Sequence, residues 1–245
     1  YSLAKKYDFS IIEDASHAIG GYYKGQPVGN CRYSDITIFS FHPVKIITTG
    51  EGGMAVTNQE DLARRMELLR SHGITRDPER MTHEPDGPWY YQQIELGYNY
   101  RMTDIQAALG LSQLNRLGSF VAKRQELARR YDQLLNDLPV VIPWQHPDTY
   151  SAFHLYPVRL QLDNLKATRR EVFNSLREQG IGVNVHYIPV HLHPYYKDIG
   201  YSMEDFPKAK QYYDEVFTLP LFPSMSSGLQ DNIVNVLRDL LKGSE

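Results

Sequence analysis

Short apolar runs separated by glycine-rich and polar connections open the chain, and amphipathic stretches follow them. The runs are rich in β-branched and aromatic residues, which is typical of buried strands, and they cover residues 9–12, 36–41 and 54–57. Apolar residues then recur every three or four positions, which predicts helices at residues 61–71, 104–117 and 120–138, the second of them capped by Thr103. Residues 2–7 are interpreted as the tail of another helix. This alternation predicts an α/β protein.

A second alternation of strands and helices follows a pair of prolines. Pro139 and Pro143 end the long helix, so we place a domain boundary between residues 138 and 139. The patterns after it predict strands at residues 152–160 and 182–187 and helices at 168–179, 204–217 and 227–241. We therefore expect residues 1–138 to form part of a large domain with a parallel-rich sheet. Residues 139–245 are expected to form a smaller α+β domain.

Composition argues against several classes of protein. The net charge of −3 is unlike that of a nucleic-acid-binding surface, which needs an excess of basic side chains. No apolar stretch approaches the roughly 20 residues that a membrane-spanning helix requires. Cys31 is the single cysteine, which excludes an intrachain disulfide and offers no metal cluster. We therefore expect a cytoplasmic protein that binds neither nucleic acid nor membrane.

Two polar side chains follow apolar runs in positions that suit one cofactor. Asp14 closes the first run within EDASH, and Lys45 follows the second within SFHPVK. If the two runs are neighbouring strands, the carboxylate and the amine lie near their ends. An enzyme that uses pyridoxal phosphate (PLP) needs a lysine to form a Schiff base and an aspartate to keep the pyridine nitrogen protonated. Each residue alone is weak support, but together they predict a PLP site.

A family resemblance runs through most of the chain. It is carried by the segments IIEDASHAIG, SDITIFSFHPVKIITTGEGGMAVT and LGYNYRMTDIQAALGLSQL. In these segments the chain resembles the DegT/StrS-type sugar aminotransferases, which share the aspartate-aminotransferase fold (PLP fold type I). The segments LRSHGI and WYYQQIELGYNYRMTDIQAALGLSQL most resemble those of the family members that act in pseudaminic acid synthesis.

The resemblance implies an activity and its partners. A PLP-dependent enzyme of this family transfers an amino group from an amino acid, here glutamate, to a nucleotide-linked 4-keto sugar, here UDP-linked. The resemblance also implies a homodimer with shared active sites. The expected partners are therefore a nucleotide sugar, an amino-acid donor and a second copy of the chain.

Site residues are carried over from the resemblance position by position. Lys45 is implied as the Schiff-base lysine and Asp14 as the partner of the pyridine nitrogen. His17 matches a position near the cofactor's ring oxygen, and Ser40 matches a serine that binds the cofactor phosphate. Asn99 matches an asparagine that helps to bind the phosphate of the neighbouring subunit's cofactor.

Three further residues are implied in binding the substrate. Arg101 could meet phosphate or substrate, and its charge suits either. His186 and Tyr187 match a segment that lines the sugar pocket in the family.

Simpler interpretations of these residues remain open. Asp14 can cap a following helix, His17 can be a packed structural histidine, and Arg101 can form a structural salt bridge. For His42, beside Lys45, a site role and a solvated imidazole are both open.

A metal site is not expected. The histidines at 186, 191 and 193 have a spacing that would suit metal ligands, but no cysteine or carboxylate cluster completes the set.

The start of the chain suggests that it corresponds to part of a longer enzyme. A helix followed at once by a strand is normally the crossover from an earlier strand. The resembled family has a longer N-terminal part of the large domain, with a turn that grips the cofactor phosphate. We therefore expect the chain to correspond to the C-terminal two-thirds of an enzyme. The rival hypothesis is a non-catalytic fragment or dimerising binding module that cannot hold PLP.

Overall fold

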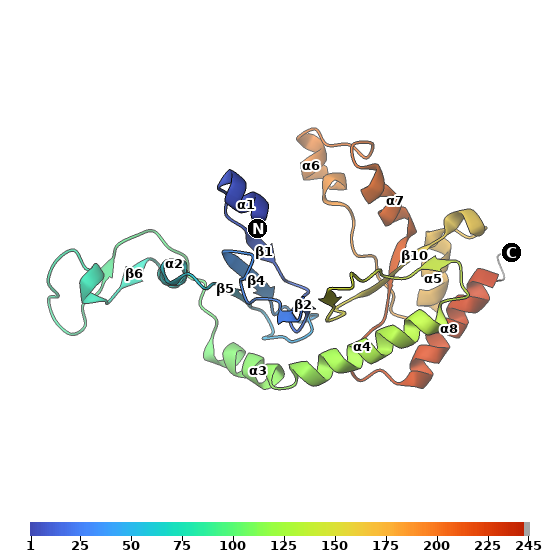
Figure 1. Ribbon diagram of the computed structural model, residues 1–245, viewed down its shortest axis with the longest axis horizontal. Helices are drawn as coiled ribbons and strands as arrows, with labels where there is room; N and C mark the ends of the chain where they lie inside the picture. Colours follow the sequence, from blue (N-terminus) through green and yellow to red (C-terminus); the bar gives the residue numbers. More distant parts are fainter. Residues whose placement is uncertain (243–245) are drawn as a thin grey trace. The chain divides into compact units, whose positions relative to one another are not determined.

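The computed structural model describes residues 1–242, and these residues form two compact units (Figure 1). The first unit contains residues 1–118 together with 148–150. The second contains residues 119–147 and the chain from residue 151 onward. Each unit has its own sheet and is considered by itself.

The central sheet of the first unit has three strands in the order β1-β4-β5. Strand β1 (Ile12–Asp14) pairs in parallel with β4 (Ile36–Ser40), and β5 (Gly53–Val56) pairs with β4 in the antiparallel sense. The expected parallel-rich sheet is thus mixed in the described residues. Strand β1 starts three residues later than predicted, and helix α1 (Ser2–Tyr7) ends at Asp8, which has a left-handed conformation.

The register of this sheet separates two faces with different chemistry. Asp14 is paired with Ile38, and Ser40 lies two residues further along β4, so all three belong to one face. Phe39 and Met54 are paired on the opposite face. That face and helix α3 (Asp104–Leu114) border an apolar cavity of about 320 Å³. The sheet therefore separates Asp14 and Ser40 from an apolar layer.

The first unit contains further elements outside this sheet. Helix α3 is capped by Thr103, as predicted, and Gln106 completes a capping box. The others are helix α2 (Glu60–Arg70), the pair β6 (Ile74–Thr75) and β7 (Gln92–Gln93), the 3-10 turn η1 (Pro78–Arg80), and a small sheet of β2 (Tyr22–Tyr23), β3 (Gln26–Pro27) and β9 (Thr149–Tyr150).

Two glycines mark a close crossing of backbone segments next to residues 98–101. A Cβ added at Gly97 would lie 2.3 Å from the Gly73 nitrogen and 2.6 Å from the His72 carbonyl carbon. Because these are backbone atoms, neither can turn aside. We expect Gly97→Ala to lower the free energy of unfolding by about 2–3 kcal/mol in urea denaturation.

Gly118→Ala is the matched control for this prediction. No atom lies within 4 Å of a Cβ added at Gly118, which is inside helix α4 (Leu117–Leu134). Helix propensity alone predicts that this change raises the free energy of unfolding by about 0.5–1 kcal/mol. Equal stability of the Gly97→Ala variant and the unchanged chain would show that the crossing can relax.

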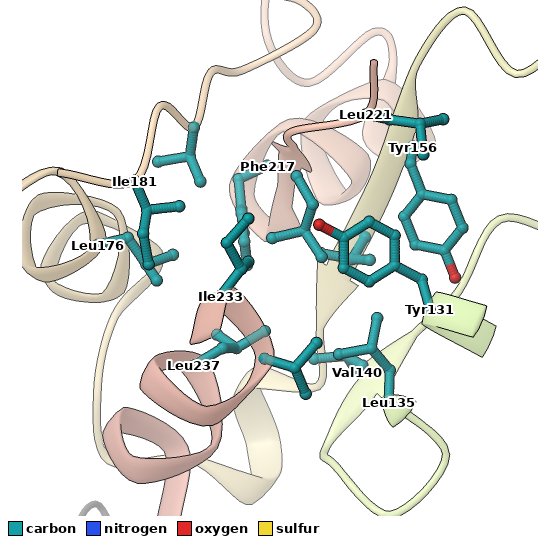
Figure 2. Close-up of a cluster of buried hydrophobic side chains, with 14 of the residues drawn as sticks. Tyr131, Leu135, Val140, Tyr156, Leu176, Ile181, Phe217, Leu221, Ile233 and Leu237 are labelled. Carbon is teal, nitrogen blue, oxygen red and sulfur yellow. The ribbon is translucent and has the colours of Figure 1, made fainter. Parts of the chain in front are cut away.

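The second unit is built on an antiparallel sheet in the order β11-β10-β8. Its strands are β8 (Val140–Val141), β10 (Tyr156–Leu160) and β11 (Val216–Leu219). The helical elements are η2 (Leu162–Asn164), α5 (Arg169–Glu178), η3 (Val190–Leu192), α6 (Pro194–Asp198), α7 (Pro207–Glu215) and α8 (Ser227–Lys242). Figure 2 shows apolar side chains of α4, the sheet and α8 meeting in one buried cluster.

The division between the units falls earlier than the predicted boundary at residues 138 and 139. Leu127, Ala128 and Tyr131 of α4 are fully buried in the cluster of the second unit, so most of this helix belongs there. Residues 148–150 return to the first unit because β9 pairs with β2. In both cases the division is set by packing between segments distant in sequence. The positions of Pro139 and Pro143 do not indicate that packing.

The predicted strand at residues 182–187 is wrong. Within the described chain this segment makes only one isolated bridge, between Asn184 and Thr218 of β11. Ile181 and Val183 are buried there, which explains the apolar pattern without a strand. Among the described residues, no helix has the length and apolar character needed to cross a membrane.

Candidate active site

Asp14 is the last residue of β1, and its carboxylate is held by the turn that follows. The Ser16 hydroxyl and backbone N–H donate to Asp14 Oδ1 at 2.5 and 3.0 Å. These two bonds, and then the charges of His17 and Lys45, hold the pKa of Asp14 below its ordinary value. Asp14 is therefore an ionised and oriented acceptor. It caps a turn, not the helix of the alternative interpretation.

Lys45 lies in the loop after β4 and is half-buried. Burial lowers the pKa of its amine, while the negative charge of Asp14 raises it by a smaller amount. The Lys45 N–H donates to the carbonyl of His42 at 3.0 Å, which forms a tight turn before the lysine. An amine with a lowered pKa is neutral, and so nucleophilic, more often than a free lysine.

The structure brings four of the predicted residues together at one edge of the sheet. Asp14 and Lys45 act on each other electrostatically, and His17 acts on Asp14. Ser40 is on the same sheet face as Asp14, and its hydroxyl oxygen accepts the His42 N–H at 3.5 Å. This grouping agrees with the expectation that the two strand ends lie side by side.

Asn99 and Arg101 are exposed residues of the first unit but belong to another segment. Asn99 bridges to Ser71, and the neighbouring Tyr98 donates its N–H to the Leu69 carbonyl at 2.7 Å. Within residues 1–242, no hydrogen bond or ion pair joins Asn99 or Arg101 to Asp14 or Lys45. The structure does not make them part of this group.

His186 and Tyr187 belong to the second unit. His186 Nδ1 and the Thr218 hydroxyl are 2.8 Å apart, and Nε2 lies 3.4 Å from Asn184 Nδ2. Tyr187 is exposed, with 58% of its surface accessible. The His186 side chain thus lies beside strand β11, and the Tyr187 ring packs edge-on against the imidazole with ring centroids 4.6 Å apart. In the described part of the chain, no three His, Cys, Asp or Glu side chains are placed to hold a metal ion.

Sequence reasoning missed the partner that orients Asp14. Ser16 follows Asp14 by two residues, which is the spacing of an Asx turn, in which an aspartate accepts bonds from the backbone two residues on. The same reading would have indicated Ser16 as a supporting residue. His42, left open before, makes an ion-pair contact of 3.8 Å with Glu51 when protonated, and both side chains are exposed.

Removing the Ser16 hydroxyl tests how Asp14 is kept ionised. We expect Ser16→Ala to raise the pKa of Asp14 toward its ordinary value, because the hydrogen bond that lowers this pKa most is lost. A carboxyl group whose pKa is lower in the folded than in the unfolded state stabilises the fold at pH values above its unfolded-state pKa. That stability is lost as pH falls through the folded-state pKa. The variant should therefore be less stable than the unchanged chain near neutral pH and equally stable in acid. Carbon-detected NMR titration of Asp14 reports the shift, and an unchanged titration would contradict it.

Comparison with known proteins places these residues in a family. Residues 1–238 match the DegT/DnrJ/EryC1/StrS aminotransferase family. The chain belongs to this family. Its α/β fold is that of the DegT-family PLP aminotransferases.

Relatives of the DegT family resemble the chain over nearly its whole length. It is 41% identical over 249 residues to the spore coat polysaccharide biosynthesis protein SpsC of Bacillus subtilis, covering 100% of this chain and 63% of that protein. It is 37% identical over 247 residues to the UDP-4-amino-4,6-dideoxy-N-acetyl-beta-L-altrosamine transaminase of Campylobacter jejuni, covering 99% of this chain and 62% of that protein. The chain thus spans less than two-thirds of the length of these two DegT-family relatives.

Solved structures agree with this assignment. The chain matches the Spr1654 protein of Streptococcus pneumoniae at 32% identity, with a TM-score of 0.85 for the PLP form and 0.87 for the PMP form. The match covers 98% of this chain and 60% of the chain in the PLP form. Members of the DegT family with this fold are therefore known in cofactor-bound forms.

Proposed function

We propose that the protein acts as a PLP-dependent aminotransferase that moves an amino group from glutamate to a UDP-linked 4-keto sugar. The observation that supports this most is the electrostatic interaction of Asp14, at the end of β1, with Lys45, in the loop after the neighbouring strand β4. An ionised carboxylate and a half-buried amine within electrostatic reach are the two groups that PLP chemistry needs. Membership of the DegT family supports the same reaction class.

The described residues fit PLP by their chemistry. Its aldehyde reacts with an amine, and burial keeps the pKa of Lys45 below that of free lysine. Its pyridine nitrogen pairs with a carboxylate, and Ser16 keeps Asp14 ionised. Its phosphate accepts hydroxyl donors, and Ser40 lies on the same sheet face as Asp14. We therefore assign Asp14, His17, Ser40 and Lys45 to cofactor binding.

Each of these residues has a part in the proposed mechanism. When bound, PLP supplies an electron sink next to the amino group of the donor. Asp14 holds a proton at the pyridine nitrogen, because its carboxylate is ionised at neutral pH. The Lys45 amine would move a proton between the donor's α-carbon and the cofactor's C4′ atom, and it would serve the sugar half of the reaction in the same role.

The proposed sugar rests on the relatives and on the second unit. The Campylobacter jejuni relative is named for a UDP-linked 4-amino sugar, and SpsC is named for polysaccharide synthesis. We assign Arg101, His186 and Tyr187 to substrate binding. Both ring nitrogens of His186 lie near side-chain partners on Asn184 and Thr218, which would present the imidazole in a fixed orientation.

We also propose that two copies share their active sites. Tyr98 and Tyr100 flank Asn99, are exposed, and stack on each other with ring centroids 4.7 Å apart. An exposed aromatic pair beside a polar residue is typical of a surface that binds a partner. Asn99 would then reach the cofactor phosphate of the second copy.

Borohydride trapping tests the proposed function. The chain is mixed with PLP, reduced, digested and mapped by mass spectrometry, and we expect the reduced cofactor on Lys45. The full-length protein is then given UDP-4-keto sugars and glutamate, and the UDP-linked amino sugar is detected. If the label were found on other lysines, or if neither this chain nor the full-length protein were labelled, the rival hypothesis of a non-catalytic binding module would be favoured.

A further inference from the structure

Both ends of the Lys45 loop meet at one residue, Phe41, which directly follows β4. The Phe41 N–H donates to the Gly52 carbonyl at 2.8 Å. The Phe41 carbonyl accepts two bonds, one from the Thr49 N–H at 3.0 Å and one from the Thr48 hydroxyl at 2.9 Å. The residues between Phe41 and Thr48, including Lys45, thus form a loop closed at its base.

Thr48 is the side chain that joins the two sides of this closure. Its hydroxyl donates to the Phe41 carbonyl and accepts the Gly50 N–H at 2.9 Å. From this arrangement we propose that Thr48 is a positioning residue for Lys45. Its hydroxyl fixes the base of the loop and thereby the place of the amine. The proposal rests on the proposed function, in which Lys45 must meet PLP in a defined orientation.

Backbone hydrogen bonds and buried side chains also hold the loop around Lys45. Ile46 and Ile47 are buried, with 5% and 3% of their surface exposed, so they anchor the loop on the side after the lysine. On the other side, His42 and Glu51 are exposed and 3.8 Å apart. An exposed ion pair of this kind contributes at most about 1 kcal/mol and often nothing measurable. The half-buried Thr48 hydroxyl makes two hydrogen bonds to backbone groups, so it stabilises the loop more than this ion pair does.

Thr48→Val removes the hydroxyl and keeps the shape of the side chain. It leaves the Phe41 carbonyl and the Gly50 N–H each without one partner, so the base of the loop opens more often. Opening lets water reach Lys45, and burial is the main cause that lowers the pKa of this amine. The variant should therefore show a Lys45 amine that behaves more like free lysine.

Thr57 offers a matched control because its hydroxyl makes the same pattern elsewhere in the first unit. It donates to the Asp35 carbonyl at 2.6 Å and accepts the Gln59 N–H at 3.1 Å. Thr57→Val thus removes an equivalent pair of bonds away from the Lys45 loop. Thr48→Ser keeps the hydroxyl and should restore the behaviour of the unchanged chain.

Two measurements on the cofactor-free chain test the proposal. Hydrogen exchange followed by NMR should show the Gly50 amide exchanging about tenfold faster in Thr48→Val, the size of effect expected for one lost hydrogen bond. Reductive methylation of Lys45, mapped by mass spectrometry across a pH series, should have its midpoint at higher pH in Thr48→Val. Neither readout should change in Thr48→Ser or Thr57→Val.

The rate at which PLP bonds to Lys45 is a third measurement, and it depends on the proposed function as well as on the role of Thr48. At limiting PLP, Thr48→Val should bond to the cofactor about tenfold more slowly than the unchanged chain. An unchanged Gly50 exchange rate and an unchanged Lys45 midpoint in Thr48→Val would overturn the proposal, as would equal shifts in Thr57→Val. If the unchanged chain forms no bond with PLP at Lys45, the proposed function fails, whereas the methylation and exchange results still decide the role of Thr48.

Discussion

Lys45→Ala is expected to abolish covalent capture of PLP and to lower the rate of transamination by about a thousandfold or more. The amine has two tasks in the proposed mechanism, since it bonds to the cofactor and then moves the proton between donor and cofactor. Alanine supplies neither. Borohydride reduction followed by peptide mapping measures the first task, and turnover of a UDP-4-keto sugar by the full-length protein measures the second.

Two further variants separate the amine from its charge and from general effects of losing a lysine. Lys45→Arg keeps a positive charge beside Asp14 but cannot bond to the aldehyde, so it should be as inactive as alanine. Lys24→Ala removes an exposed lysine of the same unit, 3.8 Å from Asp148, and should leave activity unchanged. Normal turnover by Lys45→Ala would remove the basis of the proposed mechanism.

Local signals in the sequence predicted helix starts well. Thr103 was expected to cap a helix and does so through a capping box with Gln106. The helix expected from residue 168 begins at Arg169, with Thr168 as its N-cap and Glu171 completing the box. In both caps the interacting side chains lie within four residues of each other, so the whole motif is contained in a short stretch of sequence and can be predicted from it.

Features that depend on distant packing could not be predicted in the same way. The apolar pattern of residues 182–187 includes Val183, which is buried although its segment is not a strand. A period of two reports which side chains are buried, and a strand is only one backbone that produces it. Similarly, whether helix α4 belongs to the first or the second unit depends on the partners of its buried face, which lie as far along the chain as Leu237.

The candidate site was predictable in its principal residues and less so in their support. Asp14 and Lys45 could be proposed because Asp14 closes one apolar run, Lys45 follows the next, and each carries the functional group that the chemistry needs. Ser16 and Thr48 make hydrogen bonds to a carboxylate and a backbone carbonyl, and serine or threonine at such positions is common in ordinary turns. The closure at Phe41 by the Thr48 hydroxyl becomes visible only in the structure.

Asp14→Asn is the second substitution for which we expect a large effect. Asparagine keeps the shape of the side chain and can still accept hydrogen bonds from Ser16, but it carries no charge. Without a carboxylate the pyridine nitrogen is no longer held protonated, so the electron sink weakens. We expect PLP to bond to Lys45 as before, while turnover of the full-length protein falls by about 10²–10³-fold, a size typical of losing one preorganised electrostatic group in an active site.

A titration distinguishes this electrostatic loss from a structural one. The negative charge of Asp14 raises the pKa of the Lys45 amine, so removing that charge should move the midpoint of Lys45 methylation to lower pH. Asp35→Asn is the matched control, because Asp35 also accepts one backbone N–H and one side-chain bond, from Ile11 and Gln59. It should change neither the Lys45 midpoint nor turnover. If Asp14→Asn kept full turnover, or if Asp35→Asn lost as much, Asp14 would not be the partner of the cofactor, and the cofactor would have to pair with another group.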